Sequence, residues 1–152
     1  MPYSNLEGRQ QLLDGLAEAV DEIGYALASL GAAYEQLDDA TADALEEQLF
    51  GPAQKAYGRA KRAHSEFAAR HGLAPGTFEA QTGGRASLRA RGLIDDAVAG
   101  LGRAGTALAG VQDEPALLEV GDAELRAGLA DVRALIDALP HAARELTRRL
   151  GR

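Results

Sequence analysis

The chain has no cysteine, and this absence excludes several kinds of chemistry at once. Without a thiol it can form no disulfide scaffold, thiolate zinc site, iron–sulfur cluster or cysteine nucleophile. Aromatic residues make up only 5% of the sequence, and tryptophan is absent. Because β-branched residues are also sparse and no segment alternates with a period of two, we expect no β-sheet.

Long apolar runs are also missing. The longest stretch without a charge, residues 23–34, would rise only about 18 Å as a helix, well short of a ~30 Å bilayer core. Residues 1–9 lack the charged segment followed by an apolar run that marks a secretory signal peptide. We therefore predict a cytoplasmic protein with no membrane partner.

Apolar residues are instead spaced three and four apart along four segments. These seams cover residues 13–37, 49–67, 90–111 and 125–150. The outer two carry large side chains and the inner two mostly small ones, a combination that packs closely. Over 152 residues this predicts one all-α domain, residues 1–152, built as an up-down-up-down four-helix bundle with left-handed, coiled-coil-like packing.

Glycine and proline predict where these helices end. Gly51-Pro52 predicts a break or kink between a short helix, residues 41–50, and a main helix, residues 52–71. Pro140 predicts a second break or kink in the last helix. We expect Asp38 and Asp122 to cap helices, Gly72 to end one, residues 73–84 to form the longest connection, and residues 112–121 to hold one extra turn.

The net charge of −7 is unevenly distributed. Residues 1–47 hold eleven acidic side chains against Arg9, a balance of −10, while residues 55–91 hold eight basic ones against Glu66 and Glu79, a balance of +6. We expect the acidic first helix and the basic second helix to attract each other across their edges. The overall negative charge opposes a polyanion, so nucleic acid is not an expected partner.

The best local candidate for a binding site begins at a glycine pair. Gly83 and Gly84 open a predicted helix, where free N–H groups attract anions, and Arg85 and Arg89 lie one turn apart on the same side. A bland alternative is a loop whose arginines pair with acids of the first helix.

Two histidines lie on one predicted helix. His64 and His71 are two turns, or about 10 Å, apart, which is too far to share one metal ion. A di-iron bundle needs a glutamate three residues before a histidine, a spacing that is missing here. We expect no metal and no cofactor, with His64 flanking the core and His71 at a helix C-terminus.

The segment from Arg59 to His64 resembles in spacing the arginine and histidine motif of HEPN ribonucleases, which are helical bundles and often dimeric. The resemblance covers six residues, and the position after the arginine, usually polar in that family, is Ala60. It implies RNA cleavage with Arg59 and His64 at one site.

Two hypotheses follow. The first is a non-enzymatic protein acting in protein–protein interaction or as a structural adaptor, binding copies of itself or another helical protein; glycines within the helices would let another backbone come close. The alternative is an anion-, nucleotide- or RNA-binding bundle that uses the basic residues 55–91. Its candidate site residues are Arg59, His64, His71, Gly83, Gly84, Arg85 and Arg89.

Overall fold

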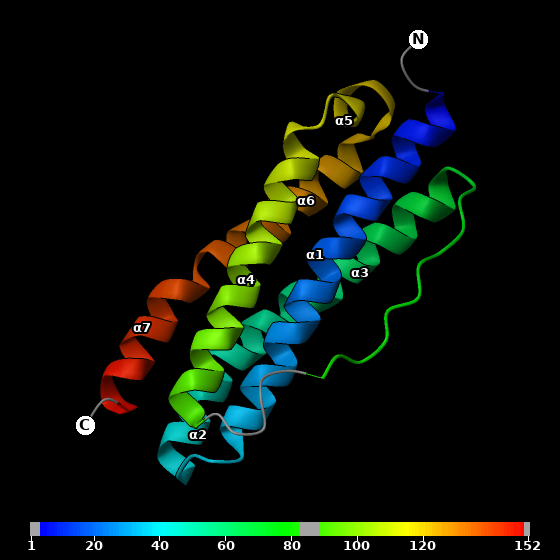
Figure 1. The fold of residues 1–152 in the computed structure, drawn as a ribbon. Coiled ribbons are helices and arrows are strands. Elements are labelled where there is room, and N and C mark those ends of the chain that lie inside the picture. Colours follow the sequence, from blue (N-terminus) through cyan, green and yellow to red (C-terminus); the bar gives the residue numbers. More distant parts are fainter. Residues whose placement is uncertain (1–3, 83–88, 151–152) are drawn as a thin grey trace.

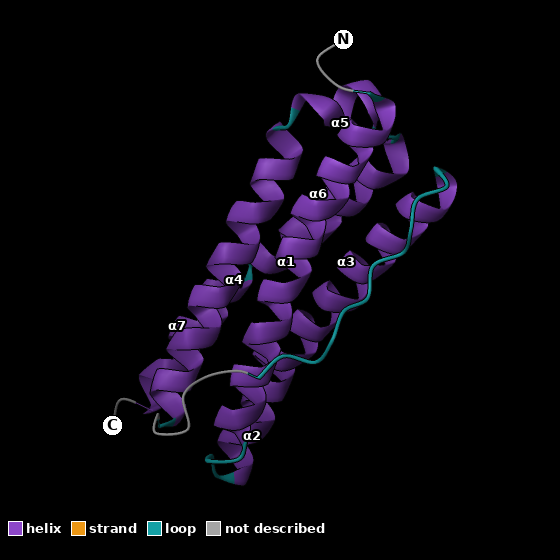
Figure 2. Cartoon of the chain, turned by 45° about the vertical axis from the view of Figure 1, so that its right-hand side comes forward, coloured by secondary structure: helices purple, strands orange, loops and turns teal. Residues whose placement is uncertain are grey.

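The protein is all-helical over the residues that the computed structural model describes, 4–82 and 89–150, and this part contains no strand (Figures 1 and 2). The all-α prediction is therefore confirmed for these residues. The elements are α1 (Asn5–Tyr34), α2 (Asp39–Leu45), the π-helical segment η1 (Glu46–Phe50), α3 (Gly51–Arg70), α4 (Ala90–Asp113), α5 (Pro115–Val120), α6 (Ala123–Asp137) and α7 (Leu139–Leu150).

The predicted up-down-up-down order is wrong. Gly15 lies against Val111 and Glu22 bonds Arg103, so α1 and α4 are antiparallel. Tyr57 of α3 packs at Gly24 of α1. His64, nearly two turns before the end of α3, lies close enough to Asp14, in the first half of α1, for that carboxylate to affect its pKa. Both α3 and α4 thus run against α1 and parallel to each other, as Figure 1 shows.

The connection between α3 and α4 makes this order possible. Residues 71–89, of which 83–88 are not described, can span about 60 Å when extended, whereas α3 is about 30 Å long. In Figure 2 the described part of this connection, residues 71–82, leaves the end of α3 and runs back alongside it. The sequence predicted a connection there, but its length permits either a turn or a crossover.

Close packing of α1 on α4 accompanies this arrangement. A Cβ added to Gly100 would lie 3.3 Å from the backbone oxygen of Glu22, which is a tight contact, so glycine favours this close approach. Both helices contribute large and small side chains to the same buried core.

The helix ends predicted at Asp38, Gly72 and Asp122 are confirmed, whereas the helix start predicted at Gly83 and Gly84 lies outside the described residues. Gly72 has φ +68°, and the N–H of Leu73 donates to the Ala68 carbonyl at 2.8 Å, which is the Schellman geometry expected after α3. Asp38 caps α2 by accepting from the Thr41 N–H at 2.8 Å, and this bond lowers the pKa of Asp38. One extra turn, α5, lies in the 112–121 connection as predicted.

The two proline predictions have different outcomes. Of the break or kink expected near Pro52, the break is absent, because the chain stays helical from Asp39 to Arg70; the kink stays a prediction. Instead η1 widens the helix just before the proline, with the Gly51 N–H bonding the Glu46 carbonyl. This register relieves the clash between a proline ring and the preceding turn. The break near Pro140 is confirmed, since the helix is interrupted at Ala138 and restarts as α7.

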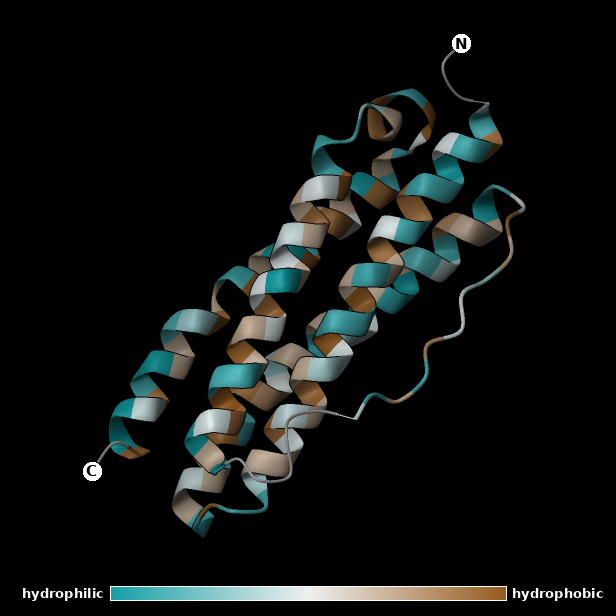
Figure 3. Cartoon of the chain, in the orientation of Figure 1, coloured by the Kyte–Doolittle hydropathy of each residue, from teal (hydrophilic) through white to brown (hydrophobic). Residues whose placement is uncertain are grey.

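The four seams form a single apolar core. All seven seam residues of α4 are buried, as are Leu13, Leu16, Val20, Ile23 and Leu30 of α1. Leu125 to Leu146 of the last seam are buried across the interruption at Ala138. Leu27 and Ala63 are only partly buried, and Tyr34 near the end of the first seam is 39% exposed. Figure 3 shows apolar and polar residues recurring along each helix, as amphipathic helices require.

Among the described residues, no helix is both long and apolar enough to cross a bilayer.

Candidate functional site

Arg59, the first predicted site residue, belongs to an ion pair between helices. Its Nη1 donates to both carboxylate oxygens of Asp131 on α6, at 2.7 and 2.6 Å. The two side chains are 41% and 47% exposed, so the pair contributes little to stability. Arg59 therefore lies on the α3–α6 side of the molecule, with its charge already matched.

His64 lies in a different place, beneath the chain that returns from α3. The imidazole is 4% exposed and meets the ring of Phe78 edge-on, with the centroids 5.1 Å apart. A Cβ on Gly76 would come within 2.8 Å of its Cε1, so this glycine lets the chain pass closely. We call residues 72–82 the strap. Within the described residues, the Nδ1 atom of His64 has no hydrogen-bond partner.

Burial also sets the charge state of His64. Desolvation lowers the pKa of this imidazole, and the Asp14 carboxylate and the Leu13 backbone oppose the effect only in part. His64 flanks the core as expected but is more buried than a position at the edge of a helical seam would be, because the strap covers it. A neutral imidazole that the strap covers has no positive charge with which to bind an anion from solution.

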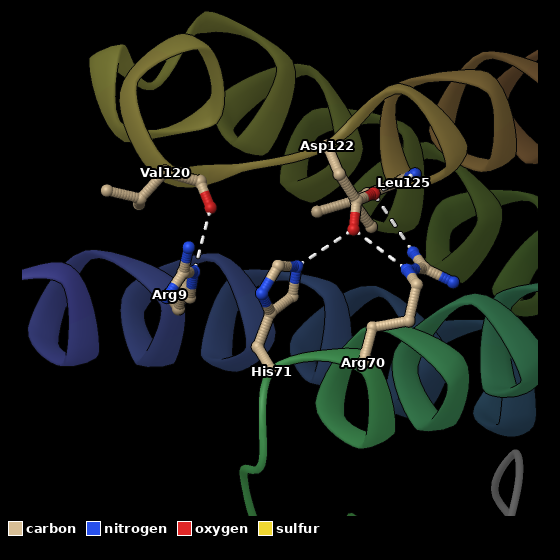
Figure 4. A network of polar contacts seen from close by, with 6 residues as sticks. All are labelled: Arg9, Arg70, His71, Val120, Asp122 and Leu125. Carbon is tan, nitrogen blue, oxygen red and sulfur yellow. Dashed lines mark hydrogen bonds and ion pairs between the residues drawn. The ribbon is translucent and has the colours of Figure 1, made fainter.

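His71 takes part in a polar cluster at the end of α3 (Figure 4). Its Nε2 lies 2.9 Å from Oδ2 of Asp122. Arg70 donates to both oxygens of this carboxylate, from Nε to Oδ2 at 2.8 Å and from Nη2 to Oδ1 at 2.9 Å. The same carboxylate caps α6 by accepting from the Leu125 N–H at 2.7 Å. We call Arg70, His71 and Asp122 the clasp, since it joins the end of α3 to the start of α6.

The clasp fixes Asp122 in its charged form. Burial alone would raise the pKa of Asp122, but the hydrogen bonds from Arg70, the Leu125 N–H and His71 outweigh it and hold the pKa far below its usual range. Beside the clasp, Arg9 of α1 donates to the Val120 carbonyl at 3.0 Å, which ties α1 to the end of α5 (Figure 4). These contacts join α1 to α5 and α3 to α6 at this end of the molecule.

The sequence-predicted site residues do not converge in this part of the structure. Arg59 points to α6, His64 is covered by the strap, and His71 binds the cap of α6. Arg89 lies exposed at the N-cap of α4 and makes no side-chain capping bond. Gly83, Gly84 and Arg85 lie outside the described residues. Anion binding by this set stays a prediction.

The charge pairing differs from expectation in its partners. The basic residues Arg59 and Arg70 of α3 pair with α6, not with the acidic α1. On the other side, Glu22 of α1 pairs with Arg103 of α4. The described residues include no cluster of three or more metal-ligating side chains.

Between α1 and α4 the surface opens into a groove of about 880 Å³, which the sequence did not predict as a site. Its floor is made of small residues, among them Gly15, Ala99, Gly102, Ala107 and Gly110. A Cβ built on Gly102 or Gly110 would have no heavy atom within 4 Å in the described chain. The sequence does show that these glycines recur at helical spacing. The pattern within one helix does not show whether a neighbouring helix covers them.

The rim of this groove is acidic. Glu18 and Glu22 line it from α1, and Glu114 lines it from the end of α4. Arg103 neutralises Glu22 at 2.8 Å, whereas Glu18 and Glu114 have no ion pair within the described residues. The groove therefore has small side chains at its floor and carboxylates without ion-pair partners among the described residues at its edges.

Searches against protein-family models, curated proteins and solved structures find no match to this chain.

Proposed function

We propose that the chain is a four-helix bundle with left-handed, coiled-coil-like packing that acts in the cytoplasm as a non-enzymatic interaction or adaptor module. It associates with copies of itself through the groove between α1 and α4. The observation that carries this proposal is the floor of that groove, where no described residue lies within 4 Å of a Cβ built on Gly102 or Gly110.

The helix neighbours support a bundle. α1 packs against both α3 and α4, and α6 packs against the same two helices from the other side. The buried residues of all four belong to one apolar cluster. A closed arrangement of this kind leaves the outer faces of α1 and α4 for other contacts.

The glycines supply the energetic argument. Each glycine inside a helix costs about 1 kcal/mol relative to alanine. At Gly100 the close approach of α1 explains the residue, but at Gly102 and Gly110 no neighbour in the described chain does so. A second helix lying in the groove would make use of the missing side chains, since small residues let backbones approach.

The positions of the candidate polar residues favour interaction over anion or RNA chemistry. The HEPN-like alternative needs Arg59 and His64 at one site, whereas one bonds Asp131 and the other is covered by the strap. His71 and Arg70 are held by Asp122. These side chains have structural partners within the described chain.

Filling the groove tests the proposal. Replacing Gly102 and Gly110 together by leucine puts bulk on the floor, where the monomer has room for it. Light scattering over a range of concentrations should show self-association in the natural chain and its loss in the double variant.

The control is Gly31→Leu on α1, where a Cβ also meets nothing but which does not line the groove. This variant should associate normally. Equal association of the double variant and the natural chain would refute the groove as the contact.

A further inference from the structure

A stripe on the outer face of α3 is complementary to the groove. Lys55, Gly58 and Arg62 are exposed, and their spacing of three and four residues places them on one side of the helix. Neither cation forms an ion pair within the described residues, in contrast to Arg59, which bonds Asp131. A Cβ on Gly58 would meet nothing within 4 Å, as at the glycines of the groove. We call these three residues the α3 stripe.

The spacing of charge is similar on the two surfaces. Lys55 and Arg62 are seven residues apart, or about 10 Å along the helix axis. The contact of Gly15 with Val111 and the Glu22–Arg103 pair fix the register of α1 against α4. In that register Glu114 lies level with about residue 12 of α1, so Glu18 and Glu114 are separated by about 9 Å along the groove.

We propose that the occupant of the α1–α4 groove is helix α3 of a second copy of this chain, docked through its Lys55–Gly58–Arg62 stripe. This inference rests on the proposed self-association and names the surface that the groove receives. Lys55 and Arg62 pair with the two unmatched carboxylates, Glu18 and Glu114, in either order along the groove. Gly58 lets the α3 backbone approach the floor at Gly102 and Gly110.

Charge disfavours the simpler symmetric contact. If two grooves faced each other across a two-fold axis, the excess of Glu18, Glu22 and Glu114 over the single cation Arg103 would be doubled in one interface. Like charges across an interface cost free energy and suppress that pairing. A contact between the acidic groove and the basic stripe avoids this repulsion.

The contact is therefore heterologous, because each copy contributes two different surfaces. Arg62 lines a second, shallow groove between α3 and α6, on the side of the molecule away from the α1–α4 groove. One copy can then bind a neighbour on each side, and the assembly grows as a ring or an open chain. Because its ion pairs are at the rim, the association weakens as salt rises.

Complementary charge reversals test this arrangement. The groove variant carries Glu18→Lys and Glu114→Lys, and the stripe variant carries Lys55→Glu and Arg62→Glu. Alone, each should associate about tenfold or more weakly than the natural chain, since favourable pairs become repulsive. Mixed at equal concentration, they should associate again. The intact stripe of the first variant fits the intact groove of the second, and the reversed stripe of the second fits the reversed groove of the first.

Matched controls separate this effect from net charge. Asp43→Lys with Glu47→Lys, and Arg144→Glu with Arg149→Glu, make the same charge changes at exposed residues without ion pairs in the described chain. Both controls should associate as the natural chain does. Light scattering at 50 and 500 mM salt reads out all samples.

Each other outcome overturns a stated part. If the mixture stays monomeric while the controls associate, α3 is not the occupant. If leucines at Gly102 and Gly110 block association but both charge variants behave like the natural chain, the groove is used by another surface and only this inference falls. If the natural chain never associates, the proposed function falls with it.

Discussion

Removing the carboxylate of Asp122 should loosen the joint between α3 and α6 in two separable steps. Asp122→Asn keeps a good N-cap for α6 but loses the charge that holds Arg70 and His71. Asp122→Ala loses the cap as well. Comparing the two variants therefore divides the contribution of the clasp into a charge part and a capping part.

The structure sets the magnitudes. Arg70 makes two short bonds to Asp122, and the side chains are 32% and 18% exposed, so the pair is partly shielded from water. A hydrogen bond to a charged group contributes about 1.5–3 kcal/mol when buried, and exposure reduces this figure. We expect Asp122→Asn to cost about 1–2 kcal/mol, and Asp122→Ala about 1 kcal/mol more from the lost cap.

Urea unfolding at neutral pH measures both values, and a pH series checks their cause. Because the folded-state pKa of Asp122 is lowered, its charged form stabilises the fold above the ordinary value of 3.8, and this contribution is lost as the pH falls below that value. The difference between the natural chain and Asp122→Asn should shrink accordingly. Equal urea midpoints at neutral pH, or a gap that stays constant into acid, would refute the reasoning.

Three further predictions concern other parts of the chain. Burial lowers the pKa of His64, so the packing of the strap on this imidazole is fully stable above the ordinary pKa of 6.5 and weakens as the pH falls below it. Hydrogen exchange of residues 74–82 should therefore become faster in acid in the natural chain, but not in the His64→Phe variant. Gly31→Ala should raise the free energy of unfolding by up to about 1 kcal/mol, whereas Gly100→Ala should lower it because of the Glu22 carbonyl, as urea titrations of each variant would show. Millimolar phosphate should leave the Tm unchanged, because Arg59 and Arg70 already bind carboxylates; a rise abolished by Arg85→Ala would favour the anion site instead.

The core was predictable because a heptad pattern is local to each helix. The spacing of Leu16, Val20 and Ile23 places them on one face whatever lies opposite, and all three are buried. The caps at Asp38 and Asp122 were equally local, since each depends on N–H groups three residues away.

Helix order was not predictable, because it depends on which helices pack together. Residues 71–89 are long enough for a turn or a crossover, and the sequence holds no local signal that separates the two. The close fit of Gly100 against the Glu22 backbone is a contact between distant segments. For the same reason the partners of Arg59 and Arg70 were assigned to α1 when they lie on α6.

The groove was predictable only in part. Glycines at 102 and 110 were visible as unusual residues in a helix, but only the packed structure shows that one face of α4 is covered while this one is open. The full burial of His64 was likewise not predictable, because the helical pattern placed it at the flank of the core and the strap lies outside that pattern.

Molar mass as a function of concentration tests the central claim, that the open α1–α4 groove serves self-association. For a chain of 15.9 kDa at low salt, we predict a mass that rises with concentration and returns to the monomer value in high salt or when Gly102 and Gly110 are both leucine. A mass that stays at 15.9 kDa at every concentration would contradict the account.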